Sequence, residues 1–263
     1  MYRDEYSHYE ENDILKLSIQ SILGNRDEQQ DSSDYLVMQD GALVVVCDGM
    51  GGHSGGRLAS RITVQTFKEK FEHMGVGQTV DKIFLDALED ADMQVYSLKN
   101  SDGSRMNAGT TVVSVYLSGG ELKWLAAGDS RIYILRQEEM CIANESHTYK
   151  WRLDKQMSLG QISEEEYRRQ LPYGEQLVNY VGRGCVDLEM TDINVNPFML
   201  MKGDRILLTT DGLFKILSDE EIKNMLANFT NLKEATRALI NKTRRKGEGY
   251  LDNVTIAVIE IKK

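Results

Sequence analysis

The stretch Asp48-Gly49-Met50-Gly51-Gly52 follows the apolar run Ala42–Cys47 and places a carboxylate where a predicted strand meets a turn. Two further aspartates, Asp211 and Asp252, also lie at one end of a strand-like run. Hard divalent cations take oxygen ligands almost exclusively, and carboxylates at the mouth of a strand-built core supply such ligands. The three aspartates therefore predict a metal-dependent hydrolase.

The glycines after Asp48 do not complete a nucleotide-binding motif. A dinucleotide-binding turn needs GxGxxG, but the register from Gly49 gives Gly51 and then Ser54. A phosphate-binding P-loop ends in GK[ST], which this stretch lacks. The glycines favour instead a backbone that turns a carbonyl towards an ion that Asp48 also binds. Taken alone, the stretch is equally compatible with a tight strand-to-helix turn that has no function.

Composition and charge limit the classes of protein and partner. The 263 residues are 41% hydrophobic, which suffices for one large domain, and no proline-rich linker divides the chain. The formal charge of −10 argues against nucleic acid or an anionic membrane surface as the main partner. No apolar run is long enough to span a bilayer, and residues 1–13 show no signal-peptide pattern. We therefore predict a cytoplasmic protein.

Strand-like runs rich in β-branched and aromatic residues alternate with helical segments. Several runs are apolar at nearly every position, which predicts burial on both faces, as in two stacked sheets covered by helices. Residues 80–98 keep a helical period, and Leu58, Ile62, Phe67 and Phe71 give a looser apolar stripe. A second helix pair follows Asp211. The strand-like runs are Leu17–Leu23, Tyr35–Gln39, Ala42–Cys47, Thr110–Leu117, Leu122–Ala127, Arg131–Leu135, Leu188–Val195, Arg205–Thr210 and Val254–Ile261.

Two segments fit this pattern least. The charged segment 147–184 is weakly strand-like, and Ser163 with Glu166 offers a helix start within it. We expect this segment to be a surface insertion that flanks the site. Residues 1–13 are expected to form an N-terminal extension.

Other candidate ligands are weaker on their own. Asp129 lies in Gly128-Asp129-Ser130-Arg131, a probable hairpin between two predicted strands, and turn chemistry alone would explain it. The four histidines have no paired helical or strand spacing, which makes zinc a poor prediction. The three cysteines are scattered without a CxxC motif, so neither a disulfide framework nor a zinc knuckle is indicated.

Taken in order, six short motifs resemble those of the type 2C protein phosphatases, the metal-dependent serine/threonine phosphatases. The resemblance covers nearly the whole chain, from about Leu17 to Ile261. DGxGG, GDSR and DNxT in one chain are specific, whereas TDG alone would indicate little. The matching segments are Arg26-Asp27-Glu28-Gln29-Gln30-Asp31 for RxxNED, Asp48-Gly49-Met50-Gly51-Gly52 for DGxGG, Ala108-Gly109-Thr110-Thr111 for AGTT, Gly128-Asp129-Ser130-Arg131 for GDSR, Thr210-Asp211-Gly212 for TDG and Asp252-Asn253-Val254-Thr255 for DNxT.

The resemblance implies an α+β fold, a four-layer αββα sandwich of two mainly antiparallel sheets flanked by helix pairs. Residues 14–263 would form a single phosphatase domain, with the insertion at about 147–184 as the family's flap. Two Mn²⁺ or Mg²⁺ ions would lie at one end between the sheets. Asp48 would bridge both ions, Gly49 would offer its carbonyl oxygen, and Asp211 and Asp252 would complete the first site.

Further roles are implied by the same resemblance. Arg26 would hold the substrate phosphate, and Asp31 would orient metal-bound water. Asp129, with Asp211, matches the positions that bind a third, weaker ion in bacterial members. A water between two cations loses a proton near neutral pH and attacks phosphorus in line, so no covalent enzyme intermediate is needed.

The chain departs from the family pattern at two places. Gln29-Gln30-Asp31 stands where the family has Asn-Glu-Asp or Asn-Gln-Asp, so Gln30 brings no carboxylate to the second ion. Met50 stands where many eukaryotic members have a histidine proposed as proton donor, and this variant resembles the bacterial branch.

The resemblance predicts a cytoplasmic, monomeric phosphatase of phosphoserine and phosphothreonine in proteins, opposing a serine/threonine kinase. An alternative of another class is a catalytically weak member of the fold that binds phosphoproteins as a regulatory module. Hydrolysis of a small phosphomonoester is a third reading. The matched arginine and aspartates favour the enzyme, and Gln29-Gln30 is the motif change that favours the regulatory module.

Overall fold

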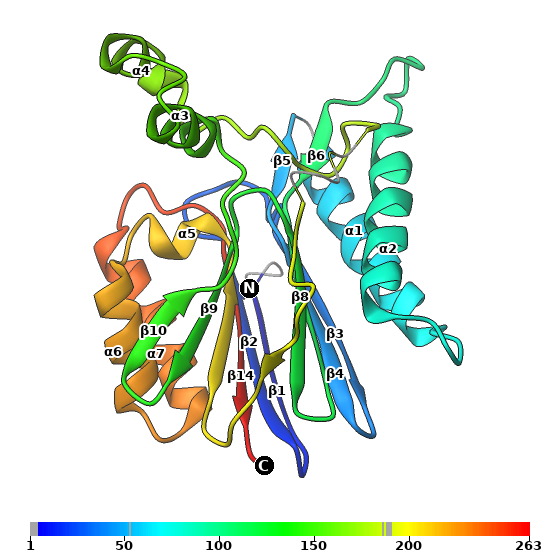
Figure 1. Ribbon diagram of the computed structural model, residues 1–263, viewed down its shortest axis with the longest axis vertical. Helices are drawn as coiled ribbons and strands as arrows, with labels where there is room; N and C mark the ends of the chain where they lie inside the picture. The colour runs from blue at the N-terminus through cyan, green and yellow to red at the C-terminus, as the bar shows by residue number, and fades with distance from the viewer. Residues whose placement is uncertain (1–4, 53, 186, 188–190) are drawn as a thin grey trace.

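The computed structural model describes residues 5–52, 54–185, 187 and 191–263. Two antiparallel sheets stack face to face, and helices cover the outer face of each, so the layers run helix, sheet, sheet, helix (Figure 1). The first sheet has the strand order β1 (Tyr6–Glu11), β2 (Leu15–Ile22), β14 (Val254–Ile261), β13 (Arg205–Thr209), β9 (Arg131–Arg136), β10 (Glu139–Ile142). The second sheet has the order β11 (Asp192–Ile193), β8 (Glu121–Ala127), β7 (Val112–Ser118), β4 (Gly41–Cys47), β3 (Ser32–Met38), with β12 (Phe198–Met199) also paired to β8. The four-layer sandwich predicted from the sequence is confirmed.

Helix pairs on the two sides come from different parts of the chain. The pair α1 (Gly55–Glu72) and α2 (Val80–Tyr96) packs on the second sheet, whereas α6 (Asp219–Asn228) and α7 (Leu232–Lys246) pack on the first. Ser218 and Glu221 form a capping box at the start of α6, with the Ser218 side chain accepting from the Glu221 N–H. The short helix α5 (Asp211–Phe214) precedes α6.

Strand β4 shows why its sequence is apolar at every position. Val44 and Val46 face the first sheet, while Leu43 and Val45 face α1 and α2. Successive side chains of a strand point to opposite faces, so a strand with a sheet on one side and helices on the other needs an unbroken apolar run. All four side chains are fully buried.

The apolar stripe expected for α1 needs one correction. Leu58 is 37% exposed, whereas Ala59, Phe67 and Phe71 are buried. Helix α1 begins at Gly55, and its rotation turns Ala59, rather than Leu58, towards the sheet.

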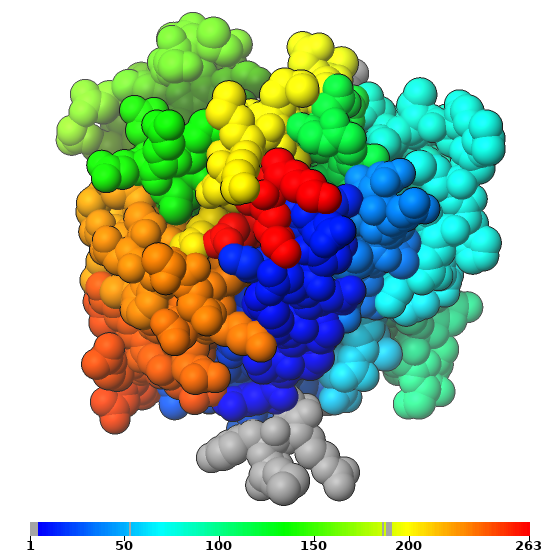
Figure 2. Space-filling model, turned by 90° about the horizontal axis from the view of Figure 1, so that it is seen from below, coloured from blue at the N-terminus to red at the C-terminus, as the bar shows by residue number. Residues whose placement is uncertain are grey.

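The N-terminal segment also differs from its description as an extension. Residues 6–11 form the edge strand β1, which pairs with β2 from Tyr6 opposite Ser21 to Glu11 opposite Lys16. These backbone hydrogen bonds add the segment to the first sheet. In Figure 2 the blue N-terminal strands lie beside the red C-terminal strand, in agreement with the pairing of β2 and β14.

The insertion at 147–184 contains α3 (Tyr149–Ser158), α4 (Glu164–Gln170) and the 3-10 turn Leu171–Tyr173. Figure 1 shows α3 and α4 standing above the sandwich, at the end where the loops of the site lie. Residues 188–190 of the strand expected at Leu188–Val195 lie outside the described residues, and β11 covers only Asp192–Ile193. No helix in the described part of the chain is long and apolar enough to cross a membrane.

Candidate active site

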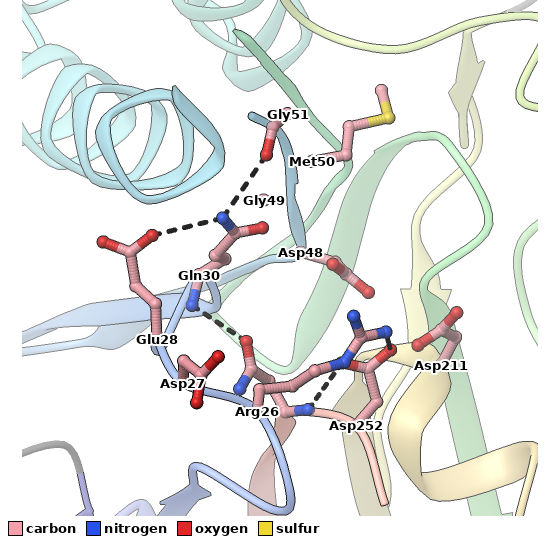
Figure 3. Close-up of a pocket in the computed structure, with 11 residues that line it drawn as sticks. Arg26, Asp27, Glu28, Gln30, Asp48, Gly49, Met50, Gly51, Asp211 and Asp252 are labelled. Carbon is pink, nitrogen blue, oxygen red and sulfur yellow. Dashed lines mark hydrogen bonds and ion pairs between the residues drawn. The ribbon is translucent and has the colours of Figure 1, made fainter. Parts of the chain in front are cut away.

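The strand order brings three separated aspartates to one end of the sandwich. Asp48 directly follows β4, Asp211 lies one residue beyond the end of β13, and Asp252 lies just before β14. Because β13 and β14 are antiparallel neighbours, the end of one and the start of the other share an edge. A cavity of about 490 Å³ opens there, and Figure 3 shows these side chains around it. Its lining residues are Arg26, Asp27, Glu28, Gln30, Asp48, Gly49, Met50, Gly51, Asp211, Asp252 and Asn253.

Hydroxyl groups of the AGTT motif hold the backbone of Asp48. The Asp48 N–H donates to Thr111 Oγ1 at 3.0 Å, and the Thr110 hydroxyl donates to the Asp48 carbonyl at 2.7 Å. Thr111 Oγ1 in turn lies 2.7 Å from Ser130 Oγ of the GDSR turn. Both threonines are buried, so these bonds exchange little with water. The motif thus fixes the position of Asp48 without entering the cavity.

A second set of hydroxyls supports Asp31. The Thr210 hydroxyl, next to Asp211, donates to Asp31 Oδ2 at 2.9 Å, and its oxygen accepts the Thr255 N–H at 3.0 Å. Asp31 itself is buried behind the cavity wall. Thr210 of the TDG motif and Thr255 of the DNxT motif therefore belong to one hydrogen-bond network, which also holds Asp31.

Gly49 occupies a position that no larger residue fits. A Cβ atom there would lie 2.2 Å from the carbonyl oxygen of Gly56 and 2.4 Å from that of Gln30. Gly49 also pairs with Thr110 in the short ribbon of β5 (Gly49–Gly51) and β6 (Ala108–Thr110). The glycine is required because two backbone segments approach it closely.

Burial and mutual repulsion make the carboxylates costly to ionise. The surrounding protein, and then Asp31 and Asp211, raise the pKa of Asp48 well above its ordinary value. Burial raises the pKa of Asp31 to about 7, although hydrogen bonds from Thr255 and Thr210 oppose that rise. A bound cation would remove both costs, because it solvates the carboxylates and screens one from another. Carboxylate and carbonyl oxygens are also the donors that Mg²⁺ and Mn²⁺ prefer, so the residues fit such ions.

Protein cations already pair with two of these carboxylates. Arg26 Nη2 lies 2.6 Å from Asp252 Oδ2, and Lys215 Nζ lies 2.5 Å from Asp211 Oδ2. Figure 3 shows the Arg26 guanidinium against Asp252 at the cavity mouth. With the side chains in these positions, the described residues contain no group of three acidic, histidine or cysteine side chains close enough together to hold a metal ion.

Asp129 lies outside this cavity. It lines a neighbouring one of about 330 Å³, together with Lys215 and Glu175. Burial and then Asp211 raise the pKa of Asp129 to about 6, so the charge of Asp211 acts on Asp129 although the two line different cavities. Nδ1 of the buried His147 accepts the Gly128 N–H at 3.0 Å, which ties the insertion to the turn that carries Asp129.

The departures at Gln29 and Gln30 have clear structural roles. Gln29 Nε2 donates to Ile22 O at 3.0 Å, and Gln29 Oε1 accepts the Asp31 N–H at 3.0 Å. Gln30 Nε2 lies 3.3 Å from Glu28 Oε2 and 3.5 Å from the Gly51 carbonyl oxygen (Figure 3). Gln29 therefore attaches the loop between β2 and β3 to the end of β2, and Gln30 links Glu28 to the glycine-rich turn.

The sequence analysis missed three residues of the site. Glu28 lines the cavity, and Asn253 Oδ1 accepts the Gln30 N–H at 2.9 Å. Lys215 pairs with Asp211. Glu28 and Asn253 stand inside the quoted RxxNED and DNxT segments, and the spacing of four between Asp211 and Lys215 is a helical ion-pair spacing, so these signals could have found them.

Comparison with known proteins agrees with this fold and site. A family model described as "Protein phosphatase 2C" matches residues 21–249. A putative protein phosphatase 2C-type of Streptococcus pyogenes serotype M6 is 27% identical over 250 residues, which cover 93% of this chain and 97% of the relative. A serine/threonine phosphatase stp of Listeria innocua is 27% identical over 222 residues, which cover 83% of this chain and 84% of the relative.

Solved structures show the same fold. The S. agalactiae serine/threonine phosphatase superposes with a TM-score of 0.80 at 26% identity, covering 94% of this chain and 100% of that one. The catalytic domain of the phosphatase PstP, solved with two manganese ions, superposes with a TM-score of 0.75 at 24% identity, covering 95% of this chain and 99% of that one. The chain belongs to the protein phosphatase 2C family. The family and enzyme class predicted from the ordered motifs are confirmed, namely the metal-dependent serine/threonine phosphatases.

Proposed function

We propose that this chain removes phosphate from phosphoserine and phosphothreonine in proteins, with two Mn²⁺ or Mg²⁺ ions held by Asp48, the Gly49 carbonyl, Asp211 and Asp252. The observation that carries the proposal is the set of hard oxygen donors that line one cavity at the end of the sandwich. Asp48 in its wall, and the buried Asp31 beside it, are costly to ionise without a cation. When bound, such ions acidify a water molecule and neutralise the phosphoryl oxygens.

The remaining roles belong to side chains that do not bind an ion directly. Arg26 can exchange its contact with Asp252 for a substrate phosphate, because a guanidinium binds carboxylate and phosphate oxygens alike. In this proposal Asp31, which the Thr210 hydroxyl holds behind the cavity wall, would orient the water that attacks phosphorus. Met50 carries no exchangeable proton, so it cannot protonate the leaving oxygen.

Exposure of the phosphate-binding group favours a protein substrate. The Arg26 side chain is 62% exposed at the cavity mouth, where a phosphorylated side chain on another protein can reach it. The negative charge of −10 agrees with a protein partner rather than nucleic acid or an anionic membrane. Our proposal also makes the enzyme a cytoplasmic monomer that opposes a serine/threonine kinase.

The proposal is tested with synthetic phosphothreonine, phosphoserine and phosphotyrosine peptides and with a small phosphomonoester. We expect Mn²⁺-dependent phosphate release from the first two peptides and loss of release in excess chelator. Release from the small ester with no turnover of either peptide would favour a small-molecule phosphatase. Peptide binding without turnover would favour the regulatory module that the Gln29-Gln30 departure suggests.

Replacement of Arg26 by alanine is expected to raise the KM for a phosphothreonine peptide by about 10-fold, since a charge-assisted bond to phosphate is worth about 1.5 kcal/mol or more. The kcat should change less, because the bond forms in both the bound and the transition state. Steady-state kinetics at saturating Mn²⁺ measure both. Arg244→Ala is the matched control, because Arg244 pairs with Glu5 at the surface and neither residue lines the cavity. An unchanged KM in Arg26→Ala would remove Arg26 from substrate binding.

Replacement of Gln30 by glutamate is expected to lower the Mn²⁺ concentration for half-maximal activity several-fold. A carboxylate in this partly solvated wall adds roughly 1 kcal/mol of attraction for a nearby ion. Gln137→Glu serves as the control, because Gln137 is an exposed residue of the turn between β9 and β10 and does not line the cavity. Equal midpoints for Gln30→Glu and the unaltered chain would show that Glu28 and Asp48 already satisfy the ion.

A further inference from the structure

Lys215 supplies a positive charge at the edge of the proposed metal centre. It follows Asp211 by four residues, with Asp211 at the start of α5 and Lys215 at its end, so the two side chains lie on one face of that turn. Lys215 Nζ lies 2.5 Å from Asp211 Oδ2. The contact places an ammonium on a carboxylate that the proposed function assigns to a metal ion.

The same lysine faces a second carboxylate pair. The cavity of about 330 Å³ beside the site is lined by Lys215 together with Asp129 and Glu175. Lys215 and Asp129 both line this cavity, so the ammonium and the carboxylate face the same space. Lys215 therefore lies among Asp211, Asp129 and Glu175.

This arrangement differs from an ordinary ion pair on a helix surface. Lys82 and Asp86 on α2 have the same spacing of four, but Asp86 is 37% exposed. Asp211 is only 14% exposed, and it lines the cavity that holds Asp48 and Asp252. The Lys215 side chain is itself 51% exposed, but its contact with a shielded carboxylate is less screened by solvent than a pair in which both partners are exposed.

We propose that the Lys215 ammonium occupies the position between Asp129 and Asp211 and prevents a divalent ion from binding there. The inference rests on the proposed function, because it concerns the ions that the same aspartates hold. The ammonium offsets the negative charge of Asp211. A divalent ion that enters beside Asp129 would be repelled by the Lys215 ammonium or would have to displace it. The centre of this chain would then hold two ions, and the third ion implied by the resemblance would be replaced by Lys215.

The experiment counts Mn²⁺ ions bound per chain, by equilibrium dialysis with elemental analysis and by titration calorimetry. The variants are Lys215→Met, which keeps the side-chain length without charge, and Lys215→Asp, which adds an oxygen ligand. Lys215→Arg keeps the charge, and Lys82→Met removes a lysine from the matched pair on α2. Circular dichroism and thermal melting establish that each variant is folded.

We expect two ions in the unaltered chain, in Lys215→Arg and in Lys82→Met. Lys215→Asp should bind a third ion at least ~10-fold more tightly than the unaltered chain, with Lys215→Met intermediate. The double variant Lys215→Asp with Asp129→Asn should lose that ion again. Three ions in the unaltered chain, or two in Lys215→Asp, would overturn the inference and leave the proposed function intact. Fewer than two ions in the unaltered chain would instead overturn the proposed function.

Discussion

Asp48→Asn is expected to lower the kcat for a phosphothreonine peptide by at least ~100-fold, the scale of losing a major electrostatic group of an active site. Asp48 is the acidic residue whose carboxylate is affected by Asp31, Asp211, Asp129 and Asp252 together, so it lies at the centre of the charge cluster. An amide keeps its shape but removes the negative charge that an ion requires. The loss should appear in kcat at saturating peptide and at every Mn²⁺ concentration.

The matched control is Asp40→Asn, because Asp40 is an exposed acid in the turn between β3 and β4. It should leave kcat unchanged. Mn²⁺ binding measured in parallel should fall in Asp48→Asn and stay unchanged in Asp40→Asn. A kcat for Asp48→Asn within a few-fold of the unaltered chain would contradict the assignment of Asp48 as the central ligand.

The metal-free protein is expected to lose stability as the pH rises, in the direction opposite to ordinary acid denaturation. The pKa of Asp31 is about 7 in the folded chain, above its ordinary value of 3.8, because the side chain is buried. The folded state therefore binds this proton more tightly than the unfolded state. Its contribution to the free energy of unfolding is fully present below pH 3.8 and is lost as the pH rises through about 7. The loss is on the order of a few kcal/mol.

Urea unfolding of the chelated protein at pH 5 and at pH 8 measures this effect. The Asp31→Asn variant should reduce the difference between the two pH values, because its side chain does not titrate, while Asp48 and Asp129 keep their raised pKa values. Adding Mn²⁺ should restore stability at pH 8, since a ligand that binds only the folded state stabilises it. The same pH slope in Asp31→Asn and in the unaltered chain would assign the loss to other groups.

Local patterns in the sequence determined the layers and the family. Strand β4 is apolar on both faces because a sheet and a helix pair cover it, and this burial is visible in the run of residues 42–47. Gly49, Thr110 and Thr111 also stand in motifs that can be recognised in the sequence. Close approach of two backbone segments requires a glycine, and the buried hydrogen bonds to Asp48 require hydroxyl side chains.

Contacts between residues far apart in the sequence could be established only from the tertiary structure. Residues 6–11 lack a strong apolar pattern, and their place as strand β1 depends on the exposed edge of β2. The support of Asp31 by Thr210 joins residues 179 positions apart, which no local period encodes. Lys215 reads in the sequence as a surface lysine of a short helix. The tertiary structure alone shows that the Lys215 ammonium lies between Asp211 and the cavity that Asp129 lines. Electrostatic interaction depends on distance in space and on burial, not on order along the chain.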